Sequence, residues 1–290
     1  IRSLQRWSEA GIELQQFAGT LMFRDIGGAY PAGTYVAEWD GTGVVSFGMD
    51  AQVSSSGMRP DGRHFAVLQV TPSDDGIYMR IEATDPGDPV REINLWMPDA
   101  GGQSFVGQRW QPGAAFSPFH PLFLERLAPF GTLRFMAMQE SNSSDIVSWS
   151  QRRDSHAVRQ SSGSQGTPSE PIANGMALEY MVELANELDA DPWFNMPYQA
   201  DDDFVRQFAT YVRDHLEPGR KVYVEWANEV WNYAWGFEAS HWLSEQAQQE
   251  GLDPDQGPWI VAGREASRDL DIWSDVFKDE TDRKLVRVAG

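Results

Sequence analysis

A carboxylate and an amide stand together where an apolar stretch of the chain turns polar. Val222, Tyr223 and Val224 are strand-forming residues, and Asn228 and Glu229 follow them closely. Parallel strands are buried on both faces of their sheet, and ligands bind at the carboxyl ends of such strands. A glutamate at that position can give or take a proton, so Glu229 is our first catalytic candidate.

Three aromatic residues come directly after this glutamate: Trp231, Tyr233 and Trp235. Flat aromatic faces match the C–H faces of pyranose rings, so these residues are candidate platforms for a sugar. Their alternation along the chain favours a core position for at least one of them. Trp226 and Trp231 flank the glutamate, and apolar neighbours favour a protonated carboxyl because they remove water from its anion.

The strand, the Asn-Glu pair and the aromatic residues after it resemble the fourth strand of the (β/α)8 barrels of glycoside hydrolase clan A. The resemblance implies that Glu229 is the general acid/base and that Asn228 binds the sugar 2-hydroxyl. It also implies that Arg134, on the second strand, lies beneath the site and contacts the nucleophile. A structural ion pair is the alternative interpretation of Arg134. The implied activity is hydrolysis of a β-linked polysaccharide, as in cellulases and other endoglycanases.

A second carboxylate is required, because glycosidic bonds break through an oxocarbenium-like transition state. The two carboxyl groups stand about 5 Å apart in retaining enzymes and about 6.5–9.5 Å apart in inverting ones. In retaining clan members the nucleophile is a glutamate near the end of the seventh strand, which this sequence does not contain. Glu140, Asp201 and Glu265 are alternatives within the chain, although a solvated surface position is favoured for each. A non-catalytic carbohydrate-binding protein is therefore the second hypothesis.

Helices and strands alternate from residue 121 to residue 290, which predicts an α/β architecture with a parallel sheet. Together with the resemblance, this predicts a partial or complete (β/α)8 TIM-type barrel, truncated after its fifth strand because a full barrel takes roughly 250 residues. The apolar periodicity predicts helices at 121–127, 176–188, 201–216 and 237–277, the last broken near Pro254, and strands at 132–138, 193–197, 222–224 and 285–288.

Two further candidates for substrate binding lie in this α/β part. Asn195 ends a predicted strand, and its side chain is expected to face the site. Trp149 lies in the loop 139–171, which is rich in serine and longer than most connections. We interpret that loop as part of a substrate cleft. Asp201, Asp202 and Asp203 together predict the start of a helix, since carboxylates stabilise helix N-termini.

The first part of the chain has a different pattern, in which short runs of β-branched and aromatic residues alternate with turn signals. Strands are predicted at 33–39, 44–47, 64–70, 77–83 and 90–97. Residues 18–100 are therefore expected to form an antiparallel β-sandwich, with 1–17 as a lead-in, 101–120 as a linker rich in glycine and proline, and 121–290 as the barrel portion. Tyr35, Trp39 and Trp96 could stack on sugars, but a core position is favoured for each.

Composition narrows the classes of partner. The net charge of −20 argues against a nucleic acid or an anionic membrane. A neutral glycan carries no such penalty, and the resemblance implies a polysaccharide or oligosaccharide as the partner. There are no cysteines, and the five histidines lack zinc-site spacing, so we expect no metal and no cofactor. A second copy of the chain could cover an open barrel edge. The compartment stays open; the sequence shows no signal peptide, and a secreted or periplasmic location is the working expectation.

Overall fold

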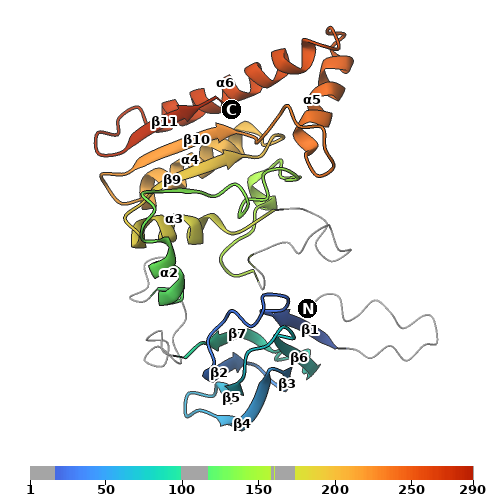
Figure 1. Cartoon of the computed structure of the whole chain (residues 1–290), viewed down its shortest axis with the longest axis vertical. Helices are drawn as coiled ribbons and strands as arrows, with labels where there is room; N and C mark the ends of the chain where they lie inside the picture. Colours follow the sequence, from blue (N-terminus) through green and yellow to red (C-terminus); the bar gives the residue numbers. More distant parts are fainter. Residues whose placement is uncertain (1–16, 99–116, 158–159, 161–173, 290) are drawn as a thin grey trace, which may run out of the picture. The chain divides into compact units, whose positions relative to one another are not determined.

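The computed structural model describes residues 17–98, 117–157, 160 and 174–289. These residues divide into two compact units, with the division near residues 110–122 (Figure 1). The first unit is built from strands, and the second from alternating helices and strands. None of the described helices combines the length and the apolar character that a membrane crossing requires.

The first unit contains two antiparallel sheets. One has the strand order β1-β6-β3 and the other the order β4-β5-β2-β7. Short strands rich in β-branched and aromatic residues, separated by tight turns, produce this arrangement. The strands are β1 (Ala18–Met22), β2 (Gly33–Asp40), β3 (Gly43–Met49), β4 (Ala51–Met58), β5 (His64–Val70), β6 (Ile77–Thr84) and β7 (Arg91–Trp96).

Side chains from both sheets share one core. Tyr35 and Trp39 of β2 are buried in it, and the ring of Trp39 lies 6.4 Å from that of Phe47 on β3. The core positions predicted for Tyr35 and Trp39 are therefore confirmed. Strand β4 was not predicted, because most of its residues are exposed and its Ser-rich sequence has little strand propensity. The segment forms a strand because it pairs antiparallel with β5.

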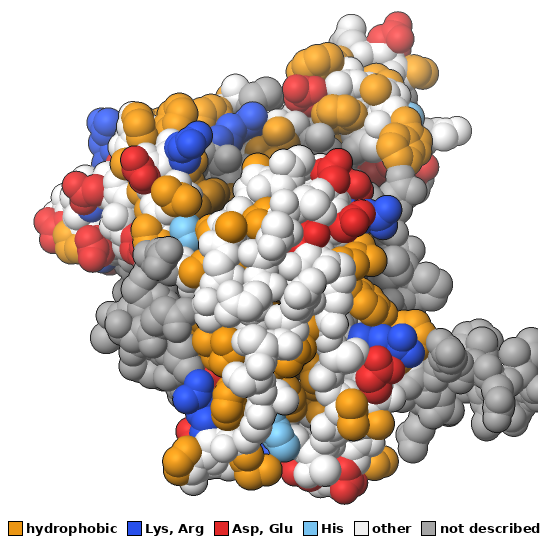
Figure 2. Space-filling view, turned by 60° about the horizontal axis from the view of Figure 1, so that its bottom comes forward, with side chains coloured by type: hydrophobic (Ala, Val, Ile, Leu, Met, Phe, Trp, Pro, Cys, Tyr) orange, Lys and Arg blue, Asp and Glu red, His pale blue; other side chains and the backbone are white. Residues whose placement is uncertain are grey.

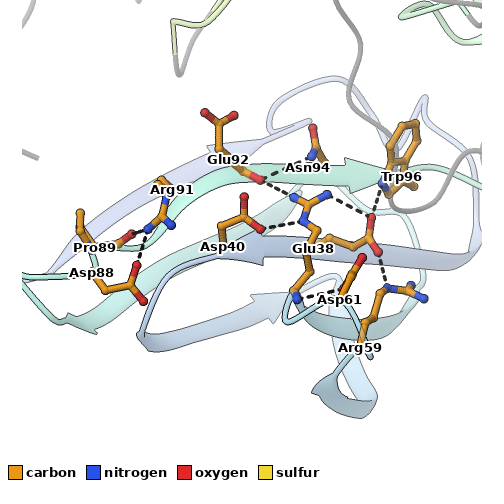
Figure 3. Close-up of polar contacts among 11 residues, drawn as sticks. Glu38, Asp40, Arg59, Asp61, Asp88, Pro89, Arg91, Glu92, Asn94 and Trp96 are labelled. Atoms are coloured by element: carbon orange, nitrogen blue, oxygen red, sulfur yellow. Dashed lines mark hydrogen bonds and ion pairs between the residues drawn. The ribbon is translucent and has the colours of Figure 1, made fainter.

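The opposite face of β2 holds a fully buried carboxylate, Glu38 (Figure 3). Its oxygens pair with the guanidinium of Arg59 at 2.5 Å and with that of Arg63 at 3.8 Å. The indole Nε1 of Trp96 donates to the same carboxylate at 3.1 Å. Trp96 thus lies on this polar face, and Arg63 also pairs with Asp40 at 2.9 Å. A buried charge is tolerated when it is compensated in this way.

The second unit contains a four-stranded parallel sheet in the order β11-β10-β9-β8. Strands and helices follow one another along the chain, so each strand is placed beside the previous one. The strands are β8 (Thr132–Arg134), β9 (Asp191–Met196), β10 (Lys221–Trp226) and β11 (Lys284–Val288). The helices are α2 (Pro121–Leu127), α3 (Leu178–Glu187), α4 (Asp202–His215), α5 (Glu238–Gln249) and α6 (Gly257–Val276), with a short 3-10 turn η2 (Trp149–Gln151).

This sheet is open, so the prediction of a partial or complete (β/α)8 barrel is wrong. Among the described residues, β8 and β11 each pair with a single neighbour, and the sheet does not close on itself. Alternation of helix and strand is the same in an open sheet and in a barrel. Closure depends instead on the number of strands and the stagger between them, which alternation does not specify.

The two faces of the parallel sheet differ in chemistry. Phe194 of β9 packs against Phe208 of α4 at 5.2 Å and Trp273 of α6 at 6.5 Å, so helices cover this face. Successive side chains of a strand point to opposite faces. Trp193 and Asn195 of the same strand therefore point away from α4 and α6, onto a face that carries polar side chains.

Local signals in the sequence set the helix ends. Asp201 is the N-cap of α4, and its carboxylate accepts a hydrogen bond from the backbone N–H of Phe204 at 2.7 Å, which confirms the predicted cap. The predicted break near Pro254 separates α5 from α6. The strand predicted at 132–138 ends early, at Arg134, because turns begin at Met136.

On the face of the protein that Figure 2 draws, hydrophobic side chains are interspersed with acidic and basic ones. The exposed apolar residues of the first unit include Val44, Met49, Val53 and Met58, all on the edge strands β3 and β4. Single exposed apolar residues of this kind are ordinary at protein surfaces.

We expect Glu38→Ala to lower the free energy of unfolding by about 3–5 kcal/mol, because Arg59 and Arg63 would lose their buried counter-ion. Urea unfolding measures this change. The matched control is Glu82→Ala, which removes a partly exposed carboxylate paired with Arg80 at 2.9 Å and should cost less than about 1 kcal/mol. Equal losses in the two variants would contradict the assignment of Glu38 as a buried, compensated charge.

A buried carboxylate in α6 predicts a dependence of stability on pH. Burial raises the pKa of Asp269 from 3.8 to about 7, although Arg268 opposes the shift by donating to its Oδ1 at 3.0 Å. The folded protein therefore binds a proton that the unfolded chain has already released between these two values. Stability due to this group is full below about pH 4 and declines as the pH rises to about 7.

We expect Asp269→Asn to remove this decline. The free energy of unfolding of the wild type, relative to that of the variant, should fall by up to about 4 kcal/mol between about pH 4 and about pH 7. Urea unfolding at several pH values measures the difference. A constant difference across that window would show that Asp269 does not take up a proton in the folded state.

Candidate functional site

A buried glutamate, Glu225, organises the polar face of the parallel sheet. It lies on β10, directly beside Asn195 of β9 in the strand register. Its Oε2 accepts three hydrogen bonds: from Arg134 Nη2 at 2.7 Å, from Trp193 Nε1 at 3.0 Å and from Asn195 Nδ2 at 2.9 Å. The three donors come from two neighbouring strands, so this single oxygen ties β8, β9 and β10 together.

Aromatic rings support the cation of this network. The guanidinium of Arg134 lies 4.8 Å from the ring centre of Trp193, and Trp193 stacks on Tyr223 at 5.7 Å. Arg134 is partly exposed, whereas Glu225 is buried. The structure therefore combines both interpretations of Arg134, since it forms an ion pair within the fold and also contacts the candidate site.

The amide of Asn228 is held from both sides. Its Oδ1 accepts from Arg134 Nη2 at 2.8 Å, and its Nδ2 donates to Asn142 Oδ1 at 2.6 Å. An amide nitrogen has two N–H donors, and Asn142 takes one of them. Asn142 belongs to the loop after β8, so the loops after β8 and β10 meet at the carboxyl edge of the sheet.

The backbone turns sharply between β10 and Glu229. Ala227 and Glu229 have φ values of +55° and +43°, in the left-handed region that costs a residue with a side chain roughly 1 kcal/mol or more. Two hydrogen bonds stabilise the turn at Ala227. The backbone N–H of Ala227 donates to Met196 O at 3.0 Å, and Asn195 Nδ2 donates to Ala227 O at 2.6 Å. Glu229 itself is half-buried, and its Oε2 accepts from Asn232 Nδ2 at 2.9 Å.

The three aromatic residues after Glu229 are all exposed. Trp231, Tyr233 and Trp235 have exposed fractions of 59%, 51% and 83%, so the expectation that at least one lies in the core is wrong. They lie in a loop between β10 and α5, where strand alternation does not apply. Trp226, in contrast, is buried in the core of this unit. Only Trp231, of the two rings expected beside Glu229, is on the surface.

The structure brings some of the predicted site residues together and not others. Arg134, Asn195 and Asn228 share one network, and Glu229 follows it directly. Trp149 packs instead against Phe204 of α4 at 5.7 Å, with Arg152 over its ring at 4.4 Å. Trp149 is thus a partly buried residue that packs against the core. Of the predicted cleft loop 139–171, residues 158–159 and 161–171 lie outside the described residues.

The alternatives for a second carboxylate differ in position. Asp201 caps α4, and Glu265 pairs with Arg268 at 2.7 Å on α6, so both have structural roles. Glu140 lies in the loop after β8, two residues before Asn142, and has a left-handed φ of +53°. Of these three carboxylates, only Glu140 belongs to a loop that contacts the Asn228 segment.

Sequence reasoning missed four residues of this site: Glu225, Trp193, Gln139 and Asn142. Glu225 carried a usable signal, because a charged residue inside an apolar strand must face away from the core. The side-chain amide of Gln139 forms two hydrogen bonds with the backbone of Asn195, each of 2.9 Å. Nothing in the sequence around Gln139 or Asn142 indicates these long-range contacts.

Comparisons with other proteins leave the site to be interpreted on its own geometry. No family model, curated protein or solved structure matches this chain. Within the described ranges, no three histidine or acidic side chains are grouped closely enough to hold a metal ion. The described site offers carboxylates, amides, a guanidinium and aromatic rings.

We expect Asn195→Ala to lower the free energy of unfolding by about 2–3 kcal/mol, because the carbonyl of Ala227 and the carboxylate of Glu225 would both lose a buried donor. Urea unfolding measures the loss. Gln207→Ala, which removes an exposed side-chain bond to Asp203 on α4, is the control and should change stability by less than about 0.5 kcal/mol. A loss no greater than that of the control would mean that Asn195 does not hold the turn.

Proposed function

We propose that this chain is a glycoside hydrolase that cleaves a β-linked polysaccharide, with Glu229 as its general acid/base. The observation that carries the proposal is the position of Glu229. It follows a parallel strand at its carboxyl end, directly after an amide held by Arg134 and Asn142 and before three exposed aromatic rings. Ligands of parallel sheets bind at this edge.

The resemblance of this segment to the fourth strand of clan A glycosidases supports the same assignment. It rests on Asn228, Glu229 and the aromatic residues after them, together with Arg134 on a preceding strand. The proposal does not depend on a closed barrel, because the residues concerned lie on β8, β9, β10 and the loops at their carboxyl ends.

The proposed reaction begins with proton transfer from Glu229 to the glycosidic oxygen while the bond to the anomeric carbon breaks. Asn228 is buried, with an exposed fraction of 3%, and in the proposed complex the second N–H of its Nδ2 donates to a sugar hydroxyl. A carboxylate on the other side of the ring must stabilise the positive charge or activate water. Glu140 is our candidate within the described residues, because its loop contacts Asn228 through Asn142.

A second function, binding of carbohydrate without cleavage, is favoured by the aromatic loop. Trp231, Tyr233 and Trp235 present more than half of their surfaces to solvent, and stacking on sugar rings requires no acid. In that case Asn228 would orient the glycan and Glu229 would accept hydrogen bonds from it. The two functions share the same loop but differ in whether product forms.

We expect Glu229→Gln to lower the release of reducing sugar by about 100-fold or more, because the amide cannot donate the proton that the leaving oxygen needs. Activity is assayed on β-glucan, xylan and mannan, with product anomers followed by NMR. Glu245→Gln, an exposed position on α5, is the control and should retain wild-type turnover.

Wild-type turnover in the Glu229→Gln variant would remove this residue from the mechanism. Binding of a glycan by the wild type with no product after long incubation would favour the carbohydrate-binding function instead. The melting temperature of each variant is recorded, so that loss of structure is not read as loss of catalysis.

A further inference from the structure

We propose that Glu225 is a positioning residue that holds Glu229 in its working place through Arg134 and Asn195. This inference rests on the proposed function, which it deepens. Glu225 is buried on the polar face of the sheet and is separated from Glu229 by Trp226, the last residue of β10, and by the turn at Ala227 and Asn228. It is therefore expected to act through other groups and not on the substrate directly.

Two of the groups that hold the turn before Glu229, the side chains of Arg134 and Asn195, also bind Glu225, whereas the backbone carbonyl of Met196 holds Ala227 N independently at 3.0 Å. Arg134 Nη2 lies 2.7 Å from Glu225 Oε2 and 2.8 Å from Asn228 Oδ1. Asn195 Nδ2 lies 2.9 Å from the same Glu225 oxygen and 2.6 Å from the carbonyl oxygen of Ala227. The carboxylate thus fixes two donors, and each donor in turn fixes one of the two residues that precede Glu229.

The turn needs such support because its backbone is strained. Ala227 and Glu229 are both in the left-handed region, where side chains other than glycine are disfavoured. If Arg134 and Asn195 were free to reorient, the turn would relax toward ordinary φ values. The Glu229 carboxyl would then move away from the position that Asn228 and the loop after β8 define.

The charge of Glu225 matters as well as its shape. Arg134 is the cation beside Asn228, and among the described residues Glu225 is the carboxylate that pairs with it. Trp193 supplies both a third donor to Glu225 and the ring on which Arg134 rests. Removing the negative charge leaves the guanidinium uncompensated next to the amide that is proposed to meet the sugar.

A purely structural role for Glu225 makes a different prediction. Substitution would then lower stability, and the molecules that stay folded would keep the turnover of the wild type. A positioning role predicts that folded molecules lose kcat much more than they change KM, because the exposed aromatic loop still binds the glycan even when Asn228 is displaced. The two roles are therefore separated by kinetics measured well below the melting temperature.

Two variants test this. Glu225→Gln keeps the size of the side chain and removes its charge. Glu225→Asp keeps the charge but shortens the side chain by one methylene, which moves the carboxylate away from its donors. We expect kcat to fall about 100-fold in the Gln variant and about tenfold or more in the Asp variant, with KM within about threefold of wild type. Glu245→Gln on α5 is again the control with unchanged kinetics.

A spectroscopic measurement provides a readout that does not depend on activity. The indole N–H of Trp193 donates to Glu225, so its ¹H–¹⁵N signal is expected to shift in both variants and to stay in place in the control. An unshifted signal would overturn the network on which the inference rests.

The outcomes separate this inference from the proposed function. If the wild type is active and Glu229→Gln is not, but the folded Glu225 variants keep wild-type kcat, the positioning role is wrong and the proposed function stands. If the wild type forms no product from any glycan of the panel, the proposed function fails and this inference fails with it.

Discussion

The second unit depends on the burial of one negative charge between parallel strands. Glu225 could not be removed from water alone, because an unpaired buried carboxylate costs several kcal/mol. Arg134, Trp193 and Asn195 each donate to the same oxygen, which makes its burial tolerable and links β8, β9 and β10 through side chains. Two of these donors, Arg134 and Asn195, also bind the turn that leads to the candidate site. The geometry of the site therefore depends on how the charge of Glu225 is compensated.

The first unit also contains a buried glutamate, and the same kinds of residue compensate its charge. Glu38 is fully buried, and it is compensated by Arg59, Arg63 and the indole N–H of Trp96. In both units an arginine supplies the charge and a tryptophan supplies a neutral donor from a neighbouring strand. The two networks differ in the other groups that their donors bind. Arg134 and Asn195 also bind a turn that leads to Glu229, whereas Arg63 continues to another carboxylate, Asp40.

Much of the local structure could be predicted, because it depends on neighbours in the sequence. The strand His64–Val70 and the helix Pro121–Leu127 have the bounds that their residues predicted, and Asp201 caps α4 as expected. Strand β4 was missed because only its pairing with β5 makes it a strand. The barrel was wrongly predicted because βα alternation is a local pattern, whereas closure of a sheet is a property of all its strands together.

Taken by itself, the sequence determined the order of helices and strands in the second unit, the net negative charge, and the presence of Asn228 and Glu229 after an apolar strand. The tertiary structure alone decided that the sheet is open, that Trp149 packs against the core and that Glu225 stands at the centre of the polar network. The physical reason is distance along the chain. Arg134 and Asn228 are 94 residues apart, and only the side-by-side packing of β8, β9 and β10 brings such residues within hydrogen-bonding distance.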